Sequence, residues 1–453
     1  MNIHFIAIGG AAMHNLALAL KAKGYQVTGS DDEINEPSKS RLAKAGLLPA
    51  EMGWFPEKIH SGLDAVILGM HARAENPELL KAQELGVKVF SYPEYLYEQS
   101  KDKLRIVVGG SHGKTSITAM ILHVLGVCKK EFDYMVGSQL AGFDTMVKVT
   151  ADAPIMVLEG DEYLSSPIDR RPKFHLYKPD IALLSGIAWD HINVFPTFEN
   201  YVEQFRIFVR QIPSTGALIY CQEDEWVRSV SEEAVEGVKK LGYGIPSNEI
   251  RDGITYLKTE IGEVPLQIFG DHNLMNLTGA RLVCNQVGIT DLEFYNAISS
   301  FKGAARRLEK IAESPKLIVF KDFAHSPSKL KATTEAVKAQ YANRRVIACM
   351  ELHTFSSLNS DFLAEYANSM NNPDVALVYY NPHTIAHKKL APITPDQVKE
   401  AFGRKDLIVM NESSDVVNYL RNQAYDKDVL LLMSSGNFDG IDLNSFAKEL
   451  ADM

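Results

Sequence analysis

Short apolar runs alternate along almost the whole chain with stretches in which apolar residues recur every three or four positions. The short runs predict strands buried on both faces, and the periodic stretches predict helices with one apolar side. Such alternation is typical of parallel sheets covered by helices. The chain has neither a short-period repeat nor a low-complexity tract. The sequence therefore predicts the α/β class.

Polar segments divide the alternation into three blocks, which fits a length of 453 residues. The first block opens with a strand at Ile3–Ile8, a Gly-Gly turn, a helix to about Lys23 and a strand at Tyr25–Gly29. The second starts with a strand at Leu104–Val108, and the third restarts with a strand at Leu317–Phe320. The expected domains are 1–103, 104–305 and 306–453.

Composition excludes several classes of protein. Lys plus Arg number 47 and Asp plus Glu 57, and the net charge of −10 argues against a protein that coats nucleic acid. The four cysteines are far apart and form no Cys-x-x-Cys pair, which favours a reducing compartment over a disulfide framework or a zinc site. The start reads as a first strand and not a signal peptide, and no apolar run is long enough to span a bilayer. We therefore expect a cytoplasmic protein without membrane insertion.

The segment "VVGGSHGKTS", Val107–Ser116, predicts a phosphate-binding loop. A strand precedes it and a helix is expected after it at Thr115–Leu125, so backbone N–H groups of the glycine-rich turn can face an anion. Lys114 adds a positive charge for the outer phosphates, and the Thr115 hydroxyl can bind a magnesium ion. Val108 stands where the longer form of the motif has its first glycine, so the match is to Gly-x-x-Gly-Lys-Thr.

Two further strands of the second block end in chemically active residues. The strand Ile155–Leu158 runs into "EGDEY", which starts at Glu159, and the strand Ile181–Ser185 is followed by "AWDH", which ends at His191. Parallel strands would bring both side chains to the edge that carries the phosphate loop. That arrangement suits magnesium bridging nucleotide phosphates, whereas solvated loop charge is the alternative for each residue alone.

The first block has half the pattern of a nucleotide-binding fold. Gly9 and Gly10 end its first strand, and Asp31 ends the second, about where an acid reaches a ribose hydroxyl. His71 follows the strand Ala65–Gly69, also at an end where such folds bind ligands. The glycine pattern is Gly-Gly-Ala-Ala and not Gly-x-Gly-x-x-Gly, so a dinucleotide is not indicated and a plain tight turn fits as well.

Amide and basic side chains lie between the second and third blocks. "GDHNLMN" opens a helix on which Asn273 and Asn276 are one turn apart and can hold a base, and Arg306-Arg307 follow. An exposed helix start and a solvated basic linker explain these residues equally well. In the third block, "KDFAHSP" places Asp322 and His325 after a strand, and the loop "MSSGNFDG" can cradle a ligand carboxylate with backbone N–H groups.

Taken together and in order, these segments resemble the Mur ligases, the ATP-dependent amide-forming enzymes of peptidoglycan metabolism. The resemblance covers essentially the whole chain and rests on "HFIAIGGAAMHNLALAL", "GYQVTGSD", "GSHGKTS", "EGDEY", "WDH", "GDHNLMN", "ARRLE" and "DFAHSP". It implies a Rossmann-like domain that binds a UDP-sugar, a central P-loop ATPase domain and a Rossmann-like C-terminal domain that brings the amino substrate.

The resemblance also implies roles for individual residues, with ATP and Mg²⁺ as cofactors. The expected ATP contacts are Gly110, Ser111, His112, Gly113, Lys114, Thr115, Ser116, His272, Asn273, Asn276 and Arg307. The expected metal ligands are Thr115, Glu159 and His191, and the residues expected at the UDP-sugar are Gly9, Gly10, Ala11, Asp31 and His71. The expected catalytic set is Lys114, His191, Arg307, Asp322 and His325. The helix "FENYVEQFRIFVRQI" has no lysine, so the carboxylated lysine of some relatives is not expected.

The implied reaction converts the lactyl carboxylate of UDP-N-acetylmuramate to an acyl phosphate, which an amine then displaces. Some family members add L-alanine in biosynthesis, and others add the recycled tripeptide L-Ala-γ-D-Glu-meso-diaminopimelate. "DEYLSSPIDRRPKF" and "MSSGNFDGI" resemble the tripeptide-adding members, and "ELHTFSSLNS" lacks the arginine pair of the alanine-adding ones. The sequence therefore favours the murein tripeptide, with L-alanine as the alternative, although His353 stands where tripeptide-adding members usually have arginine.

Two functions from other classes are alternatives to the ligase. A nicotinamide-dependent dehydrogenase would use the first block but would leave the phosphate loop unexplained. A nucleotide-sensing module would keep the loop without chemistry, and turnover in a ligase assay would exclude it.

Overall fold

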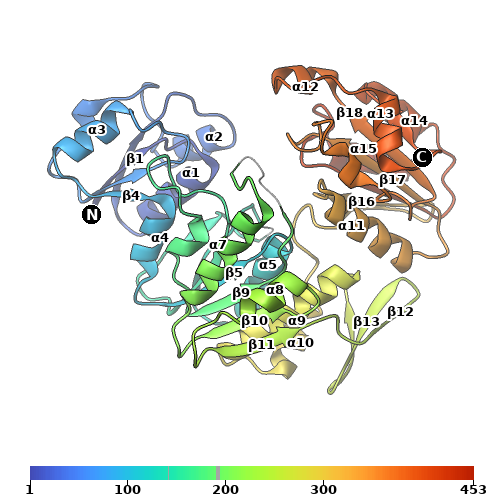
Figure 1. Cartoon of the computed structure of the whole chain (residues 1–453), viewed down its shortest axis with the longest axis horizontal. Helices are drawn as coiled ribbons and strands as arrows, with labels where there is room; N and C mark the ends of the chain where they lie inside the picture. Colours follow the sequence, from blue (N-terminus) through green and yellow to red (C-terminus); the bar gives the residue numbers. More distant parts are fainter. Residues whose placement is uncertain (141, 190–193) are drawn as a thin grey trace. The chain divides into compact units, whose positions relative to one another are not determined.

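The computed structural model describes residues 1–140, 142–189 and 194–453. Within them the chain forms two compact units, one of residues 1–244 and 275–298 and the other of residues 245–274 and 299–453. Each unit is built around parallel strands, as the sequence predicts (Figure 1).

The first unit begins with a four-stranded parallel sheet of order β2-β1-β3-β4. Strand β1 is shorter than the predicted Ile3–Ile8, because Ala7 has a φ of +66° and the N–H groups of Ala7 and Ile8 both turn to the carbonyl of Ser30. The elements are β1 (Asn2–Ile6), α1 (Ala11–Ala22), β2 (Gln26–Ser30), α2 (Ser38–Lys44), η1 (Pro56–Lys58), β3 (Ala65–Leu68), α3 (Pro77–Glu84), β4 (Val89–Ser91) and α4 (Tyr92–Ser100).

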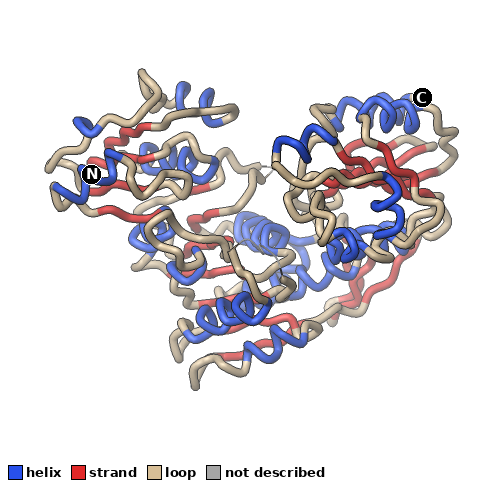
Figure 2. The backbone as a smooth tube through the Cα atoms, turned by 45° about the horizontal axis from the view of Figure 1, so that its top comes forward, coloured by secondary structure: helices blue, strands red, loops and turns tan. Residues whose placement is uncertain are grey.

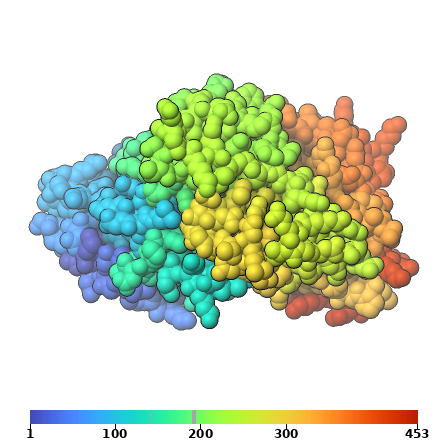
Figure 3. Space-filling view, turned by 90° about the horizontal axis from the view of Figure 1, so that it is seen from below, coloured from blue at the N-terminus to red at the C-terminus, as the bar shows by residue number. Residues whose placement is uncertain are grey.

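A seven-stranded sheet of order β11-β10-β9-β5-β8-β6-β7 follows in the same unit, parallel except for β7. Its elements are β5 (Leu104–Gly109), α5 (Lys114–Val127), β6 (Phe132–Met135), β7 (Val147–Lys148), β8 (Ile155–Glu159), α6 (Lys173–Leu176), β9 (Ile181–Leu184), α7 (Phe198–Arg210), β10 (Ala217–Cys221), α8 (Glu225–Ser231) and β11 (Lys239–Tyr243). Both sheets belong to the first compact unit, whose surface runs from blue to green in Figure 3.

Helix α7 illustrates how the sequence forms these elements. The side chain of Thr197 accepts a hydrogen bond from the Asn200 N–H at 3.2 Å and caps the helix N-terminus. The buried side chains Tyr201, Val202, Phe205, Phe208 and Val209 recur at three- and four-residue spacing, so one face of the helix packs into the core.

An antiparallel sheet that the sequence did not indicate precedes the C-terminal region, with order β12-β13-β14. Its strands pack with the second unit, since the Thr255 hydroxyl donates to Gln340 Oε1 at 2.9 Å and Gln340 Nε2 donates to the Gly253 carbonyl at 2.7 Å. The elements here are β12 (Asn248–Arg251), β13 (Ile254–Thr259), β14 (Gly262–Leu266), α9 (Asp271–Gln286) and α10 (Asp291–Ile298).

The second unit centres on a six-stranded sheet of order β15-β16-β20-β17-β18-β19, in which only β15 is antiparallel. Alternate residues of its strands belong to two separate apolar clusters, so both faces are buried beneath helices (Figure 2). Its elements are β15 (Glu309–Glu313), β16 (Leu317–Asp322), α11 (Pro327–Gln340), β17 (Val346–Leu352), η2 (Leu363–Tyr366), β18 (Val375–Tyr380), α12 (Pro382–His387), α13 (Pro395–Phe402), β19 (Ile408–Met410), α14 (Ser413–Arg421), β20 (Asp428–Met433) and α15 (Leu443–Asp452).

The predicted fold class is confirmed: parallel α/β sheets form the N-terminal, central and C-terminal parts of the chain. Among the described residues, no helix combines the length and the apolar character needed to cross a bilayer.

Candidate functional site

The predicted phosphate loop joins β5 to α5 in the backbone conformation that such a loop requires. Gly110 and Gly113 have φ angles of +127° and +76°. A Cβ on Gly110 would lie 2.3 Å from Ser185 Oγ, and one on Gly113 would lie 2.4 Å from Asn276 Oδ1. Any larger residue would therefore be strained at both positions. The N-terminus of α5 has no side-chain cap and no acid in its first turn, so its N–H groups can bind an anion.

The Lys114 ammonium is held inside this loop. It donates hydrogen bonds of 2.6 Å to the Gly110 carbonyl and 2.6 Å to Glu162 Oε2. Burial lowers the pKa of Lys114, but the carboxylates of Glu162, Asp161 and Glu159 outweigh burial and raise the pKa above its ordinary value. The lysine is therefore a permanent cation at the start of the helix.

Predicted residues on either side of Lys114 are also part of the loop. Ser111 Oγ lies 2.8 Å from the Tyr201 hydroxyl and accepts the Ala188 N–H at 2.9 Å. The carbonyl of His112 accepts a hydrogen bond from the Ser185 hydroxyl, and Ser116 is buried in the first turn of α5. These contacts fix the loop against neighbouring elements of the same unit.

The structure brings the predicted metal ligands Thr115 and Glu159 into direct contact. The Thr115 hydroxyl donates to Glu159 Oε1 at 2.8 Å, and the Gly137 N–H donates to Oε2 at 2.8 Å. Both side chains are buried and offer oxygen atoms, the ligands that Mg²⁺ prefers, so they fit that ion. The third predicted ligand, His191, lies outside the described residues.

The three residues predicted to contact adenine lie on the first turns of α9. Burial lowers the pKa of His272 to about 4, so its ring is neutral at physiological pH. Asn273 Nδ2 donates to the Phe269 carbonyl at 3.0 Å, which leaves the side-chain oxygen as an acceptor. Asn276 packs against Gly113 of the phosphate loop. An amide and the loop glycine are thus neighbours in the first unit.

In the second unit, Phe323 lies between Arg307 and His325. The Arg307 guanidinium is 4.8 Å from the Phe323 ring centre, and the His325 ring is 5.0 Å from it. Asp322, which was predicted to be catalytic, accepts the backbone N–H groups of Leu308 at 2.6 Å and Ala324 at 2.7 Å. Burial raises the pKa of Asp322, against the effect of Arg307 and these hydrogen bonds. The carboxylate therefore holds the backbone of the two segments that carry Arg307 and His325.

The five residues predicted at the UDP-sugar all line one cavity of about 730 Å³ in the first unit. The cavity lies at the carboxyl ends of β1 and β3, where the strand order reverses and such sheets bind ligands. The Gly9 N–H donates to Asp31 Oδ2 at 2.7 Å, and burial raises the pKa of Asp31. The residues brought together are Gly9, Gly10, Ala11, Asp31 and His71.

The sequence missed a polar group in this cavity. Arg41 donates to Asn15 Oδ1 at 3.2 Å and to Gln139 Oε1 at 3.2 Å, and Asn15 Oδ1 also accepts the Met146 N–H at 2.9 Å. His14 Nδ1 lies 3.0 Å from the Ser38 hydroxyl, and burial lowers the pKa of His14. An arginine in a polar helix gives no signal of such contacts, because they depend on long-range packing.

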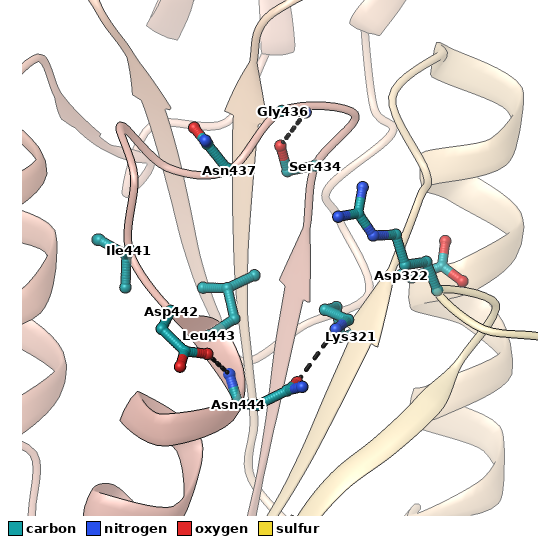
Figure 4. A pocket seen from close by; sticks show the side chains of 10 residues that line it. Lys321, Asp322, Ser434, Gly436, Asn437, Ile441, Asp442, Leu443 and Asn444 are labelled. Atoms are coloured by element: carbon teal, nitrogen blue, oxygen red, sulfur yellow. Dashed lines mark hydrogen bonds between the residues drawn. The ribbon is translucent and has the colours of Figure 1, made fainter. Parts of the chain in front are cut away.

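A smaller cavity of about 210 Å³ lies at the carboxyl ends of β16 and β20 in the second unit (Figure 4). Arg306 and Lys321 supply its cationic lining, and Lys321 donates to Asn444 Oδ1 at 3.1 Å. The Asp442 side chain caps α15 through the Asn444 N–H at 3.0 Å. The sequence predicted a ligand only for the loop "MSSGNFDG" of this lining, because the lining residues come from three segments that are far apart along the chain.

The loop "MSSGNFDG" is not free to cradle a ligand carboxylate in the way the sequence suggested. The Ser434 hydroxyl and the Phe438 N–H, the latter at 2.9 Å, both donate to Glu351 Oε2, and the Gly436 N–H donates to Ser434 Oγ at 2.6 Å. Glu351 is buried at the end of β17, next to β20. The loop therefore encloses one of the chain's own carboxylates.

Three family models match the chain in succession. The Mur ligase family catalytic domain matches residues 2–103, the Mur ligase middle domain residues 108–284, and the Mur ligase glutamate ligase domain residues 306–436. Together these ranges cover most of the chain.

Known proteins resemble the chain over its full length. A UDP-N-acetylmuramate–L-alanine ligase from Sulfurihydrogenibium sp. (strain YO3AOP1) is 30% identical over 464 residues, which cover 99% of this chain and 98% of the relative. A murein peptide ligase from Psychrobacter arcticus 273-4 has a TM-score of 0.65 at 25% identity and covers 100% of this chain and 99% of its own. A UDP-N-acetylmuramate-alanine ligase from Thermotoga maritima shares the fold, with a TM-score of 0.71 at 20% identity and coverage of 100% and 98%.

The matched ranges follow the order of the three sheets, and the phosphate loop lies at the start of the matched middle domain. Because the relative from Sulfurihydrogenibium matches nearly the whole chain, the similarity is not confined to the phosphate loop. The chain therefore belongs to the Mur ligase family of ATP-dependent, amide-bond-forming ligases.

Proposed function

We propose that the chain uses ATP to join the lactyl carboxylate of UDP-N-acetylmuramate to an L-alanyl amine, in domains bounded as 1–103, 104–305 and 306–453. The observation that carries this proposal is the group of Lys114, Thr115 and Glu159 at the N-terminus of α5. Such a group suits a nucleotide triphosphate, and the cavity at Gly9 and Asp31 offers a place for the sugar nucleotide.

The proposed reaction has two steps. The lactyl carboxylate attacks the γ-phosphorus of ATP, the bond to the bridging oxygen breaks, and ADP leaves. The amine then attacks the acyl phosphate, the C–O bond to phosphate breaks, and the amine loses a proton as the amide forms. Lys114 and the N–H groups of α5 stabilise the negative charge that develops on the transferred phosphoryl group.

Magnesium would supply further positive charge between the phosphates, and Thr115 and Glu159 would hold it, together with His191 by resemblance. Arg307, before β15, and His325, after β16, both contact the Phe323 ring and are proposed to act on the ATP phosphates and the incoming amine. Asp322 would serve them indirectly, because its oxygens already bind the backbone next to each of them.

The acceptor has two candidates, which different observations support. The full-length curated relative is described as an L-alanine ligase, and this favours free L-alanine. The murein peptide ligase from Psychrobacter arcticus is the solved structure with the higher identity of the two described above, and it is compatible with a peptide acceptor.

The residues around Glu351 favour the tripeptide. A site for free L-alanine must bind an α-carboxylate next to the reacting amine. A fixed arginine suits this, because its guanidinium can form two parallel hydrogen bonds to a carboxylate. Residues 352–361 contain no arginine. The residue just before them, Glu351, is a buried carboxylate that accepts the Phe438 N–H. A tripeptide carries its carboxylates farther along, where Arg306 and Lys321 line the cavity of Figure 4. We therefore propose the murein tripeptide as acceptor.

The basic residues Arg171 and Lys173 are weaker candidates for the tripeptide carboxylates. Arg171 is paired with Asp169, and Lys173 is paired with Asp161 at 2.8 Å. Binding a substrate carboxylate to either side chain would require breaking its ion pair.

An acceptor screen tests the proposal. Release of phosphate is measured with ATP, Mg²⁺ and UDP-N-acetylmuramate, while free L-alanine and the tripeptide are varied. No turnover with either acceptor would refute the ligase proposal for these substrates. Replacing Arg306 or Lys321 by alanine should raise the KM for the tripeptide, and Lys427→Ala, in a connecting turn of the same unit, serves as the control.

A further inference from the structure

Glu162 lies at the centre of a buried hydrogen-bonded group beside the phosphate loop. Its side chain is 1% exposed, and its Oε2 accepts the Lys114 ammonium at 2.6 Å. The other oxygen accepts the Tyr201 hydroxyl at 3.1 Å, and that hydroxyl also lies 2.8 Å from Ser111 Oγ. One carboxylate is thus connected both to the loop's lysine and to its serine.

The charges around Lys114 are unfavourable for a nucleotide that arrives alone. Within the described part of the chain, Glu162, Asp161 and Glu159 all act on the ammonium, whereas Lys173 pairs with Asp161. A triphosphate drawn to Lys114 must come close to these carboxylates. At short range in a poorly solvated site, repulsion between like charges is large.

The ion pair between Lys114 and Glu162 also opposes binding of a nucleotide without metal. If the ammonium turns to a phosphate, the ion pair between Lys114 and the buried Glu162 carboxylate is broken, which is unfavourable in a poorly solvated site. A divalent cation bound with the nucleotide compensates this charge. The same ion pair that keeps Lys114 in the loop therefore discriminates between nucleotide with magnesium and nucleotide without it.

We propose that Glu162 is a positioning residue that makes nucleotide binding depend on magnesium: it holds Lys114 in the nucleotide-free chain and excludes metal-free ATP. Tyr201 keeps the carboxylate in place. This inference rests on the proposed binding of ATP at the loop, but it does not depend on which amine is the acceptor.

The test measures the Kd of ATP calorimetrically, once with excess Mg²⁺ and once with EDTA. The Kd with EDTA divided by the Kd with Mg²⁺ should fall about tenfold in Glu162→Gln, because one buried negative charge is removed. The fall should come chiefly from tighter binding of metal-free ATP. Glu203→Gln removes an acid that pairs with Arg206 on α7, and it should leave the ratio unchanged. Tyr201→Phe keeps the Glu162 charge and should retain most of the discrimination.

An unchanged ratio in Glu162→Gln would overturn the proposal, as would a loss of affinity that is equal with and without magnesium, since that indicates a merely structural role. The double variant Lys114→Gln/Glu162→Gln, compared with Lys114→Gln, repeats the test of the Glu162 charge in the absence of the lysine. It should again bind metal-free ATP more tightly, and equal affinities would also overturn the proposal. Failure of the unchanged chain to bind ATP with magnesium would instead refute ATP binding at this loop.

Discussion

Two glycine- and serine-containing loops of this chain follow parallel strands and adjoin a buried glutamate, but only one contains its own cation. The phosphate loop follows β5, next to β8, and the loop Met433–Gly440 follows β20, next to β17. Each neighbouring strand has a buried glutamate at its carboxyl end: Glu159 is the last residue of β8, and Glu351 is the last but one of β17. Each glutamate accepts one hydroxyl and one backbone N–H, from Thr115 and Gly137 in the first case and from Ser434 and Phe438 in the second.

The difference lies in the positive charge. The phosphate loop contains Lys114 and leads directly into α5, whose N-terminus has no acidic residue. Residues 433–440 contain no lysine or arginine, and α15 begins only after Asp442, whose carboxylate caps it. A glycine- and serine-rich loop after a parallel strand therefore needs a cation or a free helix N-terminus to bind an anion. For the second loop that cation has to come from Arg306 or Lys321, which line the same cavity.

Removing the cation of the phosphate loop should have the largest effect. Lys114→Ala should lower kcat/KM about a hundredfold or more, because a charged contact to the transferring phosphoryl group is lost in a site that excludes water. Binding of UDP-N-acetylmuramate, measured calorimetrically, should change little, since its proposed cavity lies elsewhere. Lys240→Ala, which removes a surface lysine paired with Glu232, is the control. Near-normal activity of Lys114→Ala would refute the phosphate-loop interpretation.

Glu159→Ala tests the carboxylate of the first loop. A hard cation needs charged oxygen ligands, so the Mg²⁺ concentration for half-maximal activity should rise about tenfold or more. The Thr115 hydroxyl and the Gly137 N–H also lose their acceptor, and a thermal melt separates that loss of stability from the change in metal requirement. An unchanged magnesium titration would remove Glu159 from the metal site.

Glu351→Ala makes the matching change in the second loop. Leaving the Ser434 hydroxyl and the Phe438 N–H without an acceptor should lower the free energy of unfolding by about 1–3 kcal/mol, measured by denaturant titration. The KM for ATP should stay close to normal while the KM for the acceptor rises. A variant as stable as the parent chain would show that Glu351 does not hold the loop.

The stabilisation by Glu351 should also depend on pH. Burial alone would raise its pKa, but hydrogen bonds from His353, Ser434 and the Phe438 backbone outweigh burial and keep the pKa below the ordinary 4.5. The unfolded chain then binds the proton more readily, so the stabilisation is complete above pH 4.5 and is lost as the pH falls through the lower value of the folded state. The difference in stability between the parent chain and Glu351→Gln should shrink on acidification. A constant difference down to acid unfolding would contradict this.

The smallest effect is expected at the start of α15. Asp442→Ala removes a helix cap and should lower stability by about 0.5–2 kcal/mol. Asp415→Ala, within the first turn of α14 and not a cap, gives the comparison. If the N-terminus of α15 were able to bind an anion, removing the Asp442 carboxylate that caps it would instead give measurable phosphate binding.

The central loop could be predicted because its signals are local. A strand, glycines with positive φ, Lys114 and a helix follow one another within a short segment, and each constrains the next. The contact between Thr115 and Glu159 also followed from the rule that parallel strands bring their carboxyl ends to one edge.

The second loop could not be predicted in the same way. That Glu351 fills it depends on the register of β17 against β20, which pairs Met350 with Met433 and is set by packing of the whole sheet. Glu162 was visible in "EGDEY", but its partner Tyr201 lies on α7, far along the sequence. Strands β12–β14 were missed because their mostly polar, exposed sequence lacks the apolar runs that mark the other strands.

The choice of acceptor is the most direct test, because it depends on the lack of an arginine in residues 352–361. In one assay with ATP, Mg²⁺ and UDP-N-acetylmuramate, the tripeptide and free L-alanine compete, and mass spectrometry identifies the amide products. Because free L-alanine would lack a charged contact to its carboxylate, kcat/KM should favour the tripeptide by about ten- to a hundredfold. Equal or faster turnover of free L-alanine would contradict this account and assign the chain the activity named for its curated relative.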